Sequence, residues 1–355
     1  LLDDGHLPVP VFIHDEPDPE WQTGQASSWW LHHSLVALKQ SLQQLGSDLL
    51  VYSGNTQQHL SKIIEQSGAQ AVYWNRCYEP AFVKRDEALK KQLEQNGTRA
   101  SSHSAGLLRE PWQLLKKDGT PYRVFTPFWK TLVKTGPSRD PVTTPDTLPA
   151  LAGTRTPDSQ AIESLQLLPA IHWDKAFYDH WTPGENGAWR AIEDFCDSRL
   201  IDYGSDRDIP EKTGTSRLSA HLHYGEISPL QLWHYLSQLA ASDTSPGTVS
   251  AVETWLRQLG WREFSQHQLY HFSHTTLQPL DTRFEHFPWR TDNSATLASW
   301  QRGQTGIPIV DAGMRELWET GYMHNRVRMI VASLLTKNLL IPWQEGARWF
   351  WDTLV

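Results

Sequence analysis

One short segment, 318–329, carries the side chains best suited to binding chemistry. It places an aromatic ring, a histidine, an amide and two guanidinium groups at the start of an apolar helix expected to run to about Leu340. Spacing of i, i+3, i+4 and i+7 puts on one face of that helix Asn325, Arg328, Met329 and Ala332. The opposite face is predicted to be buried and carries Val327, Ile330, Val331, Leu334 and Leu335. The polar face fits a large, flat, partly charged ligand, and the alternative is a well-packed helix with a polar entrance.

A second expected helix, 255–265, repeats this combination of tryptophan with polar groups. One of its faces carries Trp255, Gln258, Trp261 or Arg262, and Ser265. An indole one turn from an amide suits a planar ring such as a base or a flavin. An aromatic core stripe would account for Leu256, Leu259 and Phe264, but it accounts poorly for the amide and the guanidinium.

The segment 214–219, Gly-Thr-Ser-Arg-Leu-Ser, precedes another expected helix and offers hydroxyls and a guanidinium. Free N–H groups and the dipole at a helix N-terminus favour an anion such as a pyrophosphate. The same pattern is also that of an ordinary helix cap, so by itself it leaves both interpretations open. No Gly-Lys-Ser or Gly-Lys-Thr motif occurs, which argues against a nucleotide triphosphatase.

Metal and hydrolytic sites are not supported by the sequence. His267 and His271 have a metal-like spacing, but no third ligand is nearby, so we expect a surface or core role for both. No Ser-His-Asp arrangement and no paired carboxylates suggest hydrolysis.

The first hundred residues supply scaffolding as alternating strands and helices. The expected strands are 8–13, 48–52 and 71–74, and the expected helices are 28–45 with Ser27 or Ser28 as cap, 57–66, and 81–96 closed by Gly97. This alternation predicts a parallel, doubly wound sheet covered by helices on both faces. No glycine fingerprint follows the first strand, so a standard dinucleotide site is not expected there.

The rest of the chain divides into a connector and a helical domain. Residues 136–183 are rich in Pro, Thr, Ser and Asp with weak periodicity, which is typical of a long connector. From Glu185 onward helical periods dominate, and Ser228-Pro229-Leu230-Gln231 has the pattern of a capping box. We therefore expect an α/β domain over 1–115, a connector over 116–184 and an all-α domain over 185–355.

Composition describes a globular, cytoplasmic protein. The 355 residues are 39% hydrophobic, without the apolar run of about eighteen residues that a membrane span needs. Only Cys77 and Cys196 are present, which favours a reducing compartment over a disulfide framework. The net charge of −8 argues against a uniformly basic surface but permits a local basic patch for nucleic acid. Tryptophan is the outlier at 18 residues, many of them beside arginine or histidine, where stacking or electron transfer would use them.

Four motifs in this order resemble the flavin-binding half of the DNA photolyase and cryptochrome family. They are Gly214–Ser219, Trp255–Phe264, Gly303–Arg315 and Met323–Arg328. The resemblance covers nearly the whole chain and is greatest to bacterial class I enzymes that act on cyclobutane pyrimidine dimers. It implies FAD as the cofactor, active when reduced and held by Tyr203, Thr215, Ser216, Arg217, Leu218, Ser219, Trp255, Arg262, Asn325 and Arg328.

The resemblance also implies a reaction, in which blue light excites reduced FAD to donate an electron to a flipped pyrimidine dimer. It makes Trp261 the residue that stacks on the lesion and gives catalytic contacts to Gln258, Asn325 and Met329. Dimer photolyases usually carry Glu where this chain has Gln258, whereas Met329 matches them. The His-His pair typical of (6-4) photoproduct enzymes is missing because Asn325 follows His324. We predict dimer repair, and the alternatives are a cryptochrome-type photoreceptor and a (6-4) photolyase.

Other roles are carried over by resemblance. Trp289 and Trp343 align with the outer members of the family's electron-transfer chain. A basic rim for UV-damaged DNA is expected from Arg207, Arg262 and Arg326, with Lys130. Residues 75–80 occupy the place of antenna-binding residues, but Ala81-Phe82 replaces the Asn-Glu pair of some folate-binding members, so a folate or deazaflavin type stays open. We expect a monomer that binds no metal.

Both ends look cut against the family pattern. The usual opening strand, with its arginine-rich motif, has no counterpart here, and the chain stops at 351–355, before the acidic, asparagine-rich loop that finishes the flavin site. We therefore expect the 355 residues alone to bind FAD weakly or not at all, and to expose apolar surface around Leu334 and Trp351.

Overall fold

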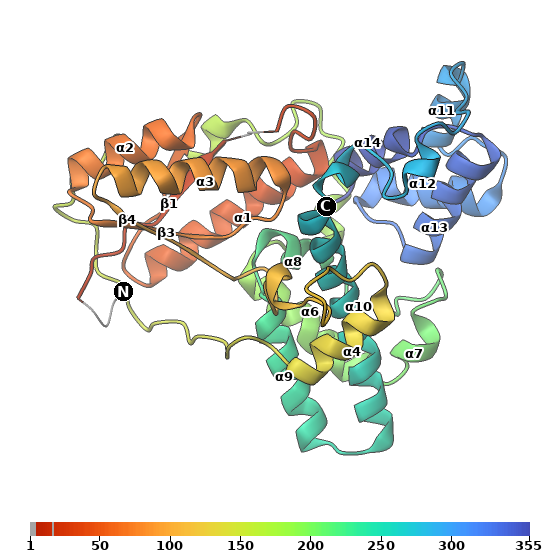
Figure 1. The fold of residues 1–355 in the computed structure, drawn as a ribbon, viewed down its shortest axis with the longest axis horizontal. Helices are drawn as coiled ribbons and strands as arrows, with labels where there is room; N and C mark the ends of the chain where they lie inside the picture. Colours follow the sequence, from red (N-terminus) through yellow and green to blue (C-terminus); the bar gives the residue numbers. More distant parts are fainter. Residues whose placement is uncertain (1–4, 16–17) are drawn as a thin grey trace.

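The computed structural model describes residues 5–15 and 18–355, which form an α/β domain and a larger helical part (Figure 1). The strands are β1 (Val11–His14), β2 (Leu50–Ser53), β3 (Ala71–Asn75) and β4 (Arg99–His103). The helices of the α/β domain are α1 (Gln25–Gln44), α2 (Thr56–Ser67) and α3 (Pro80–Gln95). The helical part contains α4 (Phe125–Thr135), α5 (Phe177–His180), α6 (Glu185–Ser198), α7 (Tyr203–Asp206), α8 (Ser219–Tyr224), α9 (Pro229–Ser242), α10 (Pro246–His271), α11 (Ser294–Gln301), α12 (Pro308–Thr320), α13 (Asn325–Ser333) and α14 (Trp343–Thr353).

Local sequence signals set several helix ends as expected. Asn55 caps α2 by accepting from the backbone N–H of Gln58 at 3.0 Å. The capping box predicted at Ser228 is confirmed, since Ser228 and Gln231 exchange both of its hydrogen bonds at the start of α9. The predicted cap of α1 at Ser27 or Ser28 is wrong, because α1 begins at Gln25 and its first N–H donates to the carboxylate of Asp352 at 2.9 Å.

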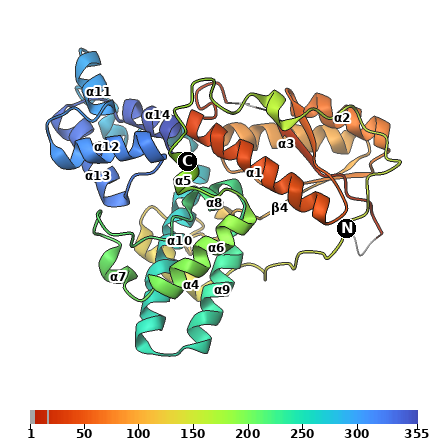
Figure 2. The same cartoon turned by 180° about the vertical axis from the view of Figure 1, so that it is seen from behind.

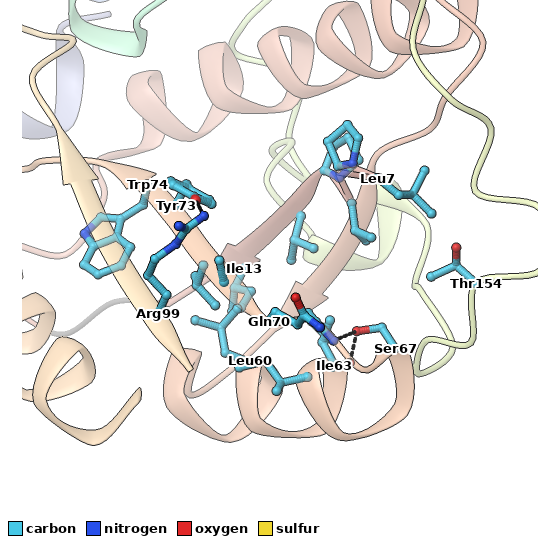
Figure 3. A pocket seen from close by; sticks show the side chains of 18 of the residues that line it. Leu7, Ile13, Leu60, Ile63, Ser67, Gln70, Tyr73, Trp74, Arg99 and Thr154 are labelled. Carbon is cyan, nitrogen blue, oxygen red and sulfur yellow. Dashed lines mark hydrogen bonds between the residues drawn. The ribbon is translucent and has the colours of Figure 1, made fainter. Parts of the chain in front are cut away.

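The four strands form two parallel pairs, with α1 on the opposite side from α3 (Figure 2). β1 pairs with β2, with Val11 opposite Leu50, and β3 pairs with β4. Between β1 and β3 lies a groove of about 1230 Å³, lined by apolar side chains that include Leu60 and Ile63 of α2 (Figure 3). The parallel direction agrees with the sequence, but the described strands do not form one continuous sheet.

The helical part is built around α10, which packs against α4, α7 and α9. The close approach of α4 depends on Gly260, since a methyl carbon there would lie 2.3 Å from the ring of Trp129. Phe125, Phe128 and Leu132 of α4 belong to the same buried cluster as α10. The range expected to be a connector therefore begins with a helix of the core. Within the described ranges, no helix is long and apolar enough to cross a membrane.

The last four helices, α11 to α14, surround a second core that includes Trp300 and Met314. Val327 and Val331 of α13 are buried there as predicted, whereas Ile330 is 38% exposed, so its assignment to the buried face is wrong. The α-helix also ends earlier than expected, at Ser333, and continues as a π-helical turn over Leu334–Asn338. α14 returns to the α/β domain, where the Trp351 indole donates to the carbonyl of Gln22 at 2.7 Å.

Replacing Gly260 with alanine is expected to destabilise the folded protein by roughly 1–3 kcal/mol, the usual cost of overpacking a core. Gly247, near the start of the same helix, is the matched control, because a methyl group there would meet nothing within 4 Å. Gly247→Ala should be neutral or stabilising by up to about 1 kcal/mol. Urea denaturation of both variants measures the difference, and equal stabilities would contradict the close packing of α4 on α10.

Candidate functional site

Predicted site residues lie on α7, on α10, in the loop 207–219 and at the start of α13, and hydrogen bonds between their side chains connect these segments. Figures 1 and 2 show where α7, α10 and α13 lie in the fold. Each of these bonds joins residues that are far apart in the sequence. Arg207 contacts Gln258, Ser216 contacts Trp255, and Thr215 contacts Tyr322. The fold thus assembles the three polar segments that the sequence singled out.

The loop 214–219 is held by aromatic residues. The hydroxyl of Thr215 lies 3.2 Å from the Tyr322 hydroxyl, and Ser216 Oγ accepts from the Trp255 indole at 3.3 Å. Arg217 has a φ of +54°, a left-handed conformation that is uncommon outside glycine. Its guanidinium lies 4.8 Å from the Tyr322 ring centroid. Backbone held in a sparsely populated conformation is frequent at ligand sites, which supports a binding role for this loop.

A second guanidinium, that of Arg328, faces the same region from α13. Its Nε donates to the carbonyl of Met323 at 2.7 Å, and its carbon lies 5.7 Å from the Tyr322 ring centroid. Burial lowers the pKa of this guanidinium, opposed by Tyr322 and Glu316. The Tyr322 ring thus has two arginines near it, Arg217 from the loop 214–219 and Arg328 from α13.

These groups fit an anionic, flat ligand such as FAD. In the described part of the chain neither Arg217 nor Arg328 forms an ion pair with a carboxylate. Two guanidinium groups beside the hydroxyls of Thr215 and Ser216 would be satisfied by phosphate oxygens, which pair well with arginine. The donors present therefore match the group that the sequence motifs imply.

Three of the predicted cofactor residues are part of the hydrophobic core. Tyr203, Leu218 and Trp255 are all less than 7% exposed and belong to the cluster around α10. The Leu218 side chain is buried away from solvent, so a contact with a ligand would fall to its backbone. Ser219 and Asn325 are exposed at the first positions of α8 and α13.

Trp261 lies at the mouth of the site, with 45% of its surface exposed. One face of its indole stacks on Phe125 of α4, with centroids 3.6 Å apart and planes 9° from parallel. Phe125 in turn stacks on Trp129. A solvent-exposed indole fixed from behind in this way is a rigid platform on which a base could stack.

Beside Trp261, Gln258 belongs to a polar network. Its Oε1 accepts from Arg207 Nη2 at 3.1 Å, and Asp208 accepts from both Arg207 and Arg326. Met329 is 56% exposed next to Arg326, whose Nη1 lies 3.6 Å from its sulfur. The structure thus brings the predicted catalytic and DNA-contact residues of this edge together, and it adds Asp208, which the sequence did not single out.

Arg262 differs from the expectation of a DNA-contacting residue. Its guanidinium donates to the carbonyls of Gly106 and Leu222, and burial lowers its pKa. Its neighbour Glu263 is fully buried and accepts from the N–H groups of Leu108, at 2.9 Å, and Arg109. This pair joins α10 to the end of the α/β domain, so Arg262 is a structural contact here and not part of an exposed rim.

The remaining predicted residues lie away from this centre. Trp289 is half-buried against Phe287, and Trp343 is half-buried at the first position of α14. In the segment 75–80, the Tyr78 hydroxyl donates to the carboxylate of Glu110 at 2.8 Å, and Glu110 also pairs with Arg76.

The two histidines with metal-like spacing make protein contacts. His267 Nε2 accepts from the Tyr122 N–H at 3.1 Å, and burial lowers its pKa to about 4. His271 Nε2 lies 3.1 Å from the carbonyl oxygen of Pro111. Through these contacts both imidazole rings hold the segment 111–122 against α10.

Comparison with known proteins gives two family matches. A family described as the FAD binding domain of DNA photolyase matches residues 255–355, and one described as DNA photolyase matches residues 3–150. The first match contains Trp255, Gln258, Trp261, Asn325 and Arg328, which are among the residues singled out from the sequence.

Individual relatives agree with these matches. The chain is 43% identical to the deoxyribodipyrimidine photo-lyase of Agrobacterium fabrum, over 98% of this chain and 71% of that protein. It is 37% identical to cryptochrome-2 of Arabidopsis thaliana, over 98% of this chain and 58% of that protein. A solved class III photolyase from Agrobacterium tumefaciens has a TM-score of 0.93 at 43% identity, covering 99% of this chain and 72% of that one. The sequence motifs had suggested class I.

Glu263 generates a prediction about pH. Burial raises the pKa of its carboxyl to about 7, from 4.5 for an unperturbed glutamate. The folded state therefore holds a proton that the unfolded state has lost, so the contribution of Glu263 to the free energy of unfolding should fall as pH rises from about 4.5 to 7 and level off above; the lowered pKa of His267 contributes in the opposite direction below about pH 6.5. The loss should be at most about 3 kcal/mol, since one pKa unit corresponds to about 1.4 kcal/mol.

The variant Glu263→Gln keeps an oxygen that accepts from Leu108 and Arg109 but does not ionise. Relative to the unaltered protein, its free energy of unfolding should increase as pH rises from about 4.5 to 7 and should be the higher of the two at pH 8, while the contribution of His267 is the same in both proteins and cancels. Glu253→Gln, an exposed position of α10, is the control and should keep the original profile. Denaturation at pH 5 to 8 provides the measurement, and parallel profiles for the unaltered protein and Glu263→Gln would count against a buried, protonated carboxyl.

Proposed function

The chain belongs to the DNA photolyase and cryptochrome family, and on that premise we propose that it repairs cyclobutane pyrimidine dimers in DNA, as a light-driven carbon–carbon lyase. The observation that carries the proposal is Trp261, an exposed indole stacked from behind on Phe125. A photoreceptor without a DNA substrate has no need of a rigid, solvent-facing platform beside the flavin motif. A flipped pyrimidine dimer would use it directly.

The cofactor side of the site is assigned to residues whose chemistry fits FAD. Thr215, Ser216 and Arg217 would hold its phosphates, and Arg328 would face the negative charge of the reduced ring. Trp255 and Asn325 would line that ring from α10 and α13. When bound, FAD in its reduced form supplies the light absorption and the electron that opens the dimer.

The chain's own residues supply binding and orientation. The Trp261 indole would hold the lesion by stacking, while the Gln258 amide would hydrogen-bond to a pyrimidine edge. The exposed Met329 would add apolar contact at the same edge. Stacking also excludes water from the space between the lesion and the cofactor, which keeps an unstable reduced lesion from side reactions.

DNA contact outside the lesion is assigned to Arg326 first. Its side chain is 42% exposed, against 18% for that of Arg207. Lys130 is exposed on α4, the helix that carries Phe125. Since the chain has a net charge of −8, phosphate binding would depend on this local group of cations and not on the overall charge.

Electron supply and light harvesting remain further proposals. Trp289 and Trp343 would carry electrons to the cofactor from the protein surface, as their alignment with the family's tryptophan chain implies. A second chromophore would bind near 75–80, where Arg76, Tyr78 and Glu110 form a partly buried cluster. Its chemical type stays open.

The finer architecture of the α/β domain is also a proposal, namely one doubly wound parallel sheet. Both described pairs are parallel, and the groove between β1 and β3 presents apolar side chains along its length (Figure 3). One extended strand placed there would hydrogen-bond to both neighbours, because adjacent strands lie about 4.8 Å apart. It would convert the two pairs into a single sheet.

A cryptochrome-type photoreceptor is the second candidate. It is favoured by Gln258, an amide where dimer photolyases usually carry a glutamate, and by the similarity to a plant cryptochrome. Both candidates bind the same cofactor, so the flavin site does not separate them. A (6-4) photolyase is the third candidate, and Asn325 after His324 argues against it.

Blue-light repair tests the proposal. The full-length protein, loaded with reduced FAD, is mixed with duplex DNA that contains defined thymine dimers, and the dimers are counted after illumination and after an equal time in the dark. We expect loss of dimers only in the light. Intact dimers with a fully reduced, light-responsive flavin would favour the photoreceptor.

Trp261→Ala is expected to weaken binding to dimer-containing DNA by roughly 1–3 kcal/mol, the worth of one base–aromatic stack. The flavin spectrum should be nearly unchanged, because Trp255 and not Trp261 lies against the cofactor loop. Trp318→Ala is the matched control, an exposed tryptophan that stacks on Trp349 of α14. Loss of flavin with retained dimer affinity would reverse the proposed roles of Trp255 and Trp261.

Arg326→Ala should weaken binding to every DNA sequence alike and leave the flavin content unchanged. Removing one phosphate contact should lower the slope of log affinity against log salt by about 0.9. The exposed Arg302, in the turn between α11 and α12, is the control position. Filter binding at several salt concentrations measures the slope, and affinity that does not depend on ionic strength would exclude a phosphate role.

A further inference from the structure

Arg207 makes a contact that a phosphate-binding residue does not need. Its Nη2 donates to the side-chain oxygen of Gln258 at 3.1 Å, and its guanidinium carbon lies 5.4 Å from the Tyr203 ring centroid. Only 18% of the Arg207 side chain is exposed. The guanidinium is therefore directed at the amide on α10 and packed against an aromatic ring.

This contact decides which end of the Gln258 amide is available to a ligand. A guanidinium has donors only, so the atom of Gln258 that faces Arg207 must be the oxygen. The amide nitrogen then points elsewhere, and its one protein acceptor is the distant carbonyl of Thr254, at 3.4 Å. Gln258 consequently offers N–H donors at the mouth of the site.

Asp208 keeps Arg207 in place. Its carboxylate lies 3.4 Å from Arg207 Nε and 2.8 Å from Arg326 Nε. Hydrogen bonding to Arg326 holds the pKa of Asp208 below its usual range, so this carboxylate is ionised at neutral pH. Arg207 is thus fixed from α13 and from its own loop while it directs Gln258.

We propose that Arg207 is a positioning residue for lesion recognition: it fixes the Gln258 amide so that its N–H group meets a carbonyl oxygen on the pyrimidine edge. The inference rests on the proposed repair function. On this proposal Arg207 increases the preference for damaged over undamaged DNA. A residue that contacted only phosphate would instead increase the affinity for any DNA. Without Arg207 the amide turns freely, and half of its orientations present an acceptor to another acceptor.

A double-mutant cycle in the dark tests the proposal on the full-length protein with FAD bound. Arg207→Met keeps the packing on Tyr203 but removes the donor, and Gln258→Met removes the amide. Affinities are measured for the same duplex with and without a thymine dimer. We expect Arg207→Met to reduce the ratio of the two affinities by about three- to tenfold, the worth of one hydrogen bond.

The second readout is the energetic coupling between the Arg207 and Gln258 substitutions. If Arg207 acts through Gln258, the double variant should lose no more discrimination than either single variant. A phosphate role predicts instead an equal loss for both duplexes, a salt slope lowered by about 0.9, and effects that add to those of Gln258→Met. Any one of these three results overturns the proposal. Lys130→Ala, measured beside it, supplies the reference behaviour of a phosphate contact, because Lys130 is exposed and lies outside the network of Arg207, Asp208 and Arg326.

Flavin absorbance and the denaturation midpoint of each variant show whether the fold is retained. If Arg207→Met unfolds, Arg207→Gln replaces it, since glutamine keeps a donor of different reach and should recover part of the discrimination. An unaltered protein that binds both duplexes equally would overturn the repair function itself. Discrimination that survives in both Arg207 variants would overturn only the role of Arg207.

Discussion

The position of α10 in the molecule depends on one pair of adjacent charged residues. Arg262 donates to carbonyls of Gly106 and Leu222, and Glu263 accepts from the amides of Leu108 and Arg109. A buried carboxyl group is costly unless it is hydrogen-bonded, so α10 has few alternative positions against the α/β domain. This docking sets the positions of Trp255, Gln258 and Trp261, the site residues that α10 carries.

Three residues of α10 make different contacts in the site. Trp255 lies buried against the loop 214–219, Gln258 faces Arg207, and Trp261 reaches solvent over Phe125. Along one helix the side chains thus change from buried, at Trp255, to solvent-exposed, at Trp261. A cofactor held beside Trp255 and a lesion held on Trp261 would be brought together without movement of the helix.

The cationic groups of the site are unevenly compensated. Asp208 partly neutralises Arg207 and Arg326, while Arg217 and Arg328 are surrounded by the Tyr322 ring and hydroxyl groups. Glu316 interacts electrostatically with both Arg217 and Arg328 but, in the part of the chain that the structure describes, forms no ion pair with either, so these two guanidinium groups can still bind phosphate and reduced flavin. Arg207 and Arg326, which pair with Asp208, instead hold their neighbours in place. The same residue type therefore binds ligand at one end of the site and positions side chains at the other.

The sequence by itself determined the α/β-then-helical order and the capping box at Ser228, because periodicity and caps are local properties. That three polar segments share one site was implied by the family resemblance of their motifs. Tertiary structure decided the rest. In the folded protein, Asp352 from the far end of the chain accepts from the first N–H of α1, and Ile330 is exposed. Helix α4 packs into the helical core, and Arg262, expected to contact DNA, instead binds the carbonyl of Gly106 between the two domains. The tertiary structure also placed Asp208 and Phe125 in the site, which no local pattern marks. Each of these outcomes depends on the partner that a side chain meets across the fold, and spacing along one helix carries no information about that partner.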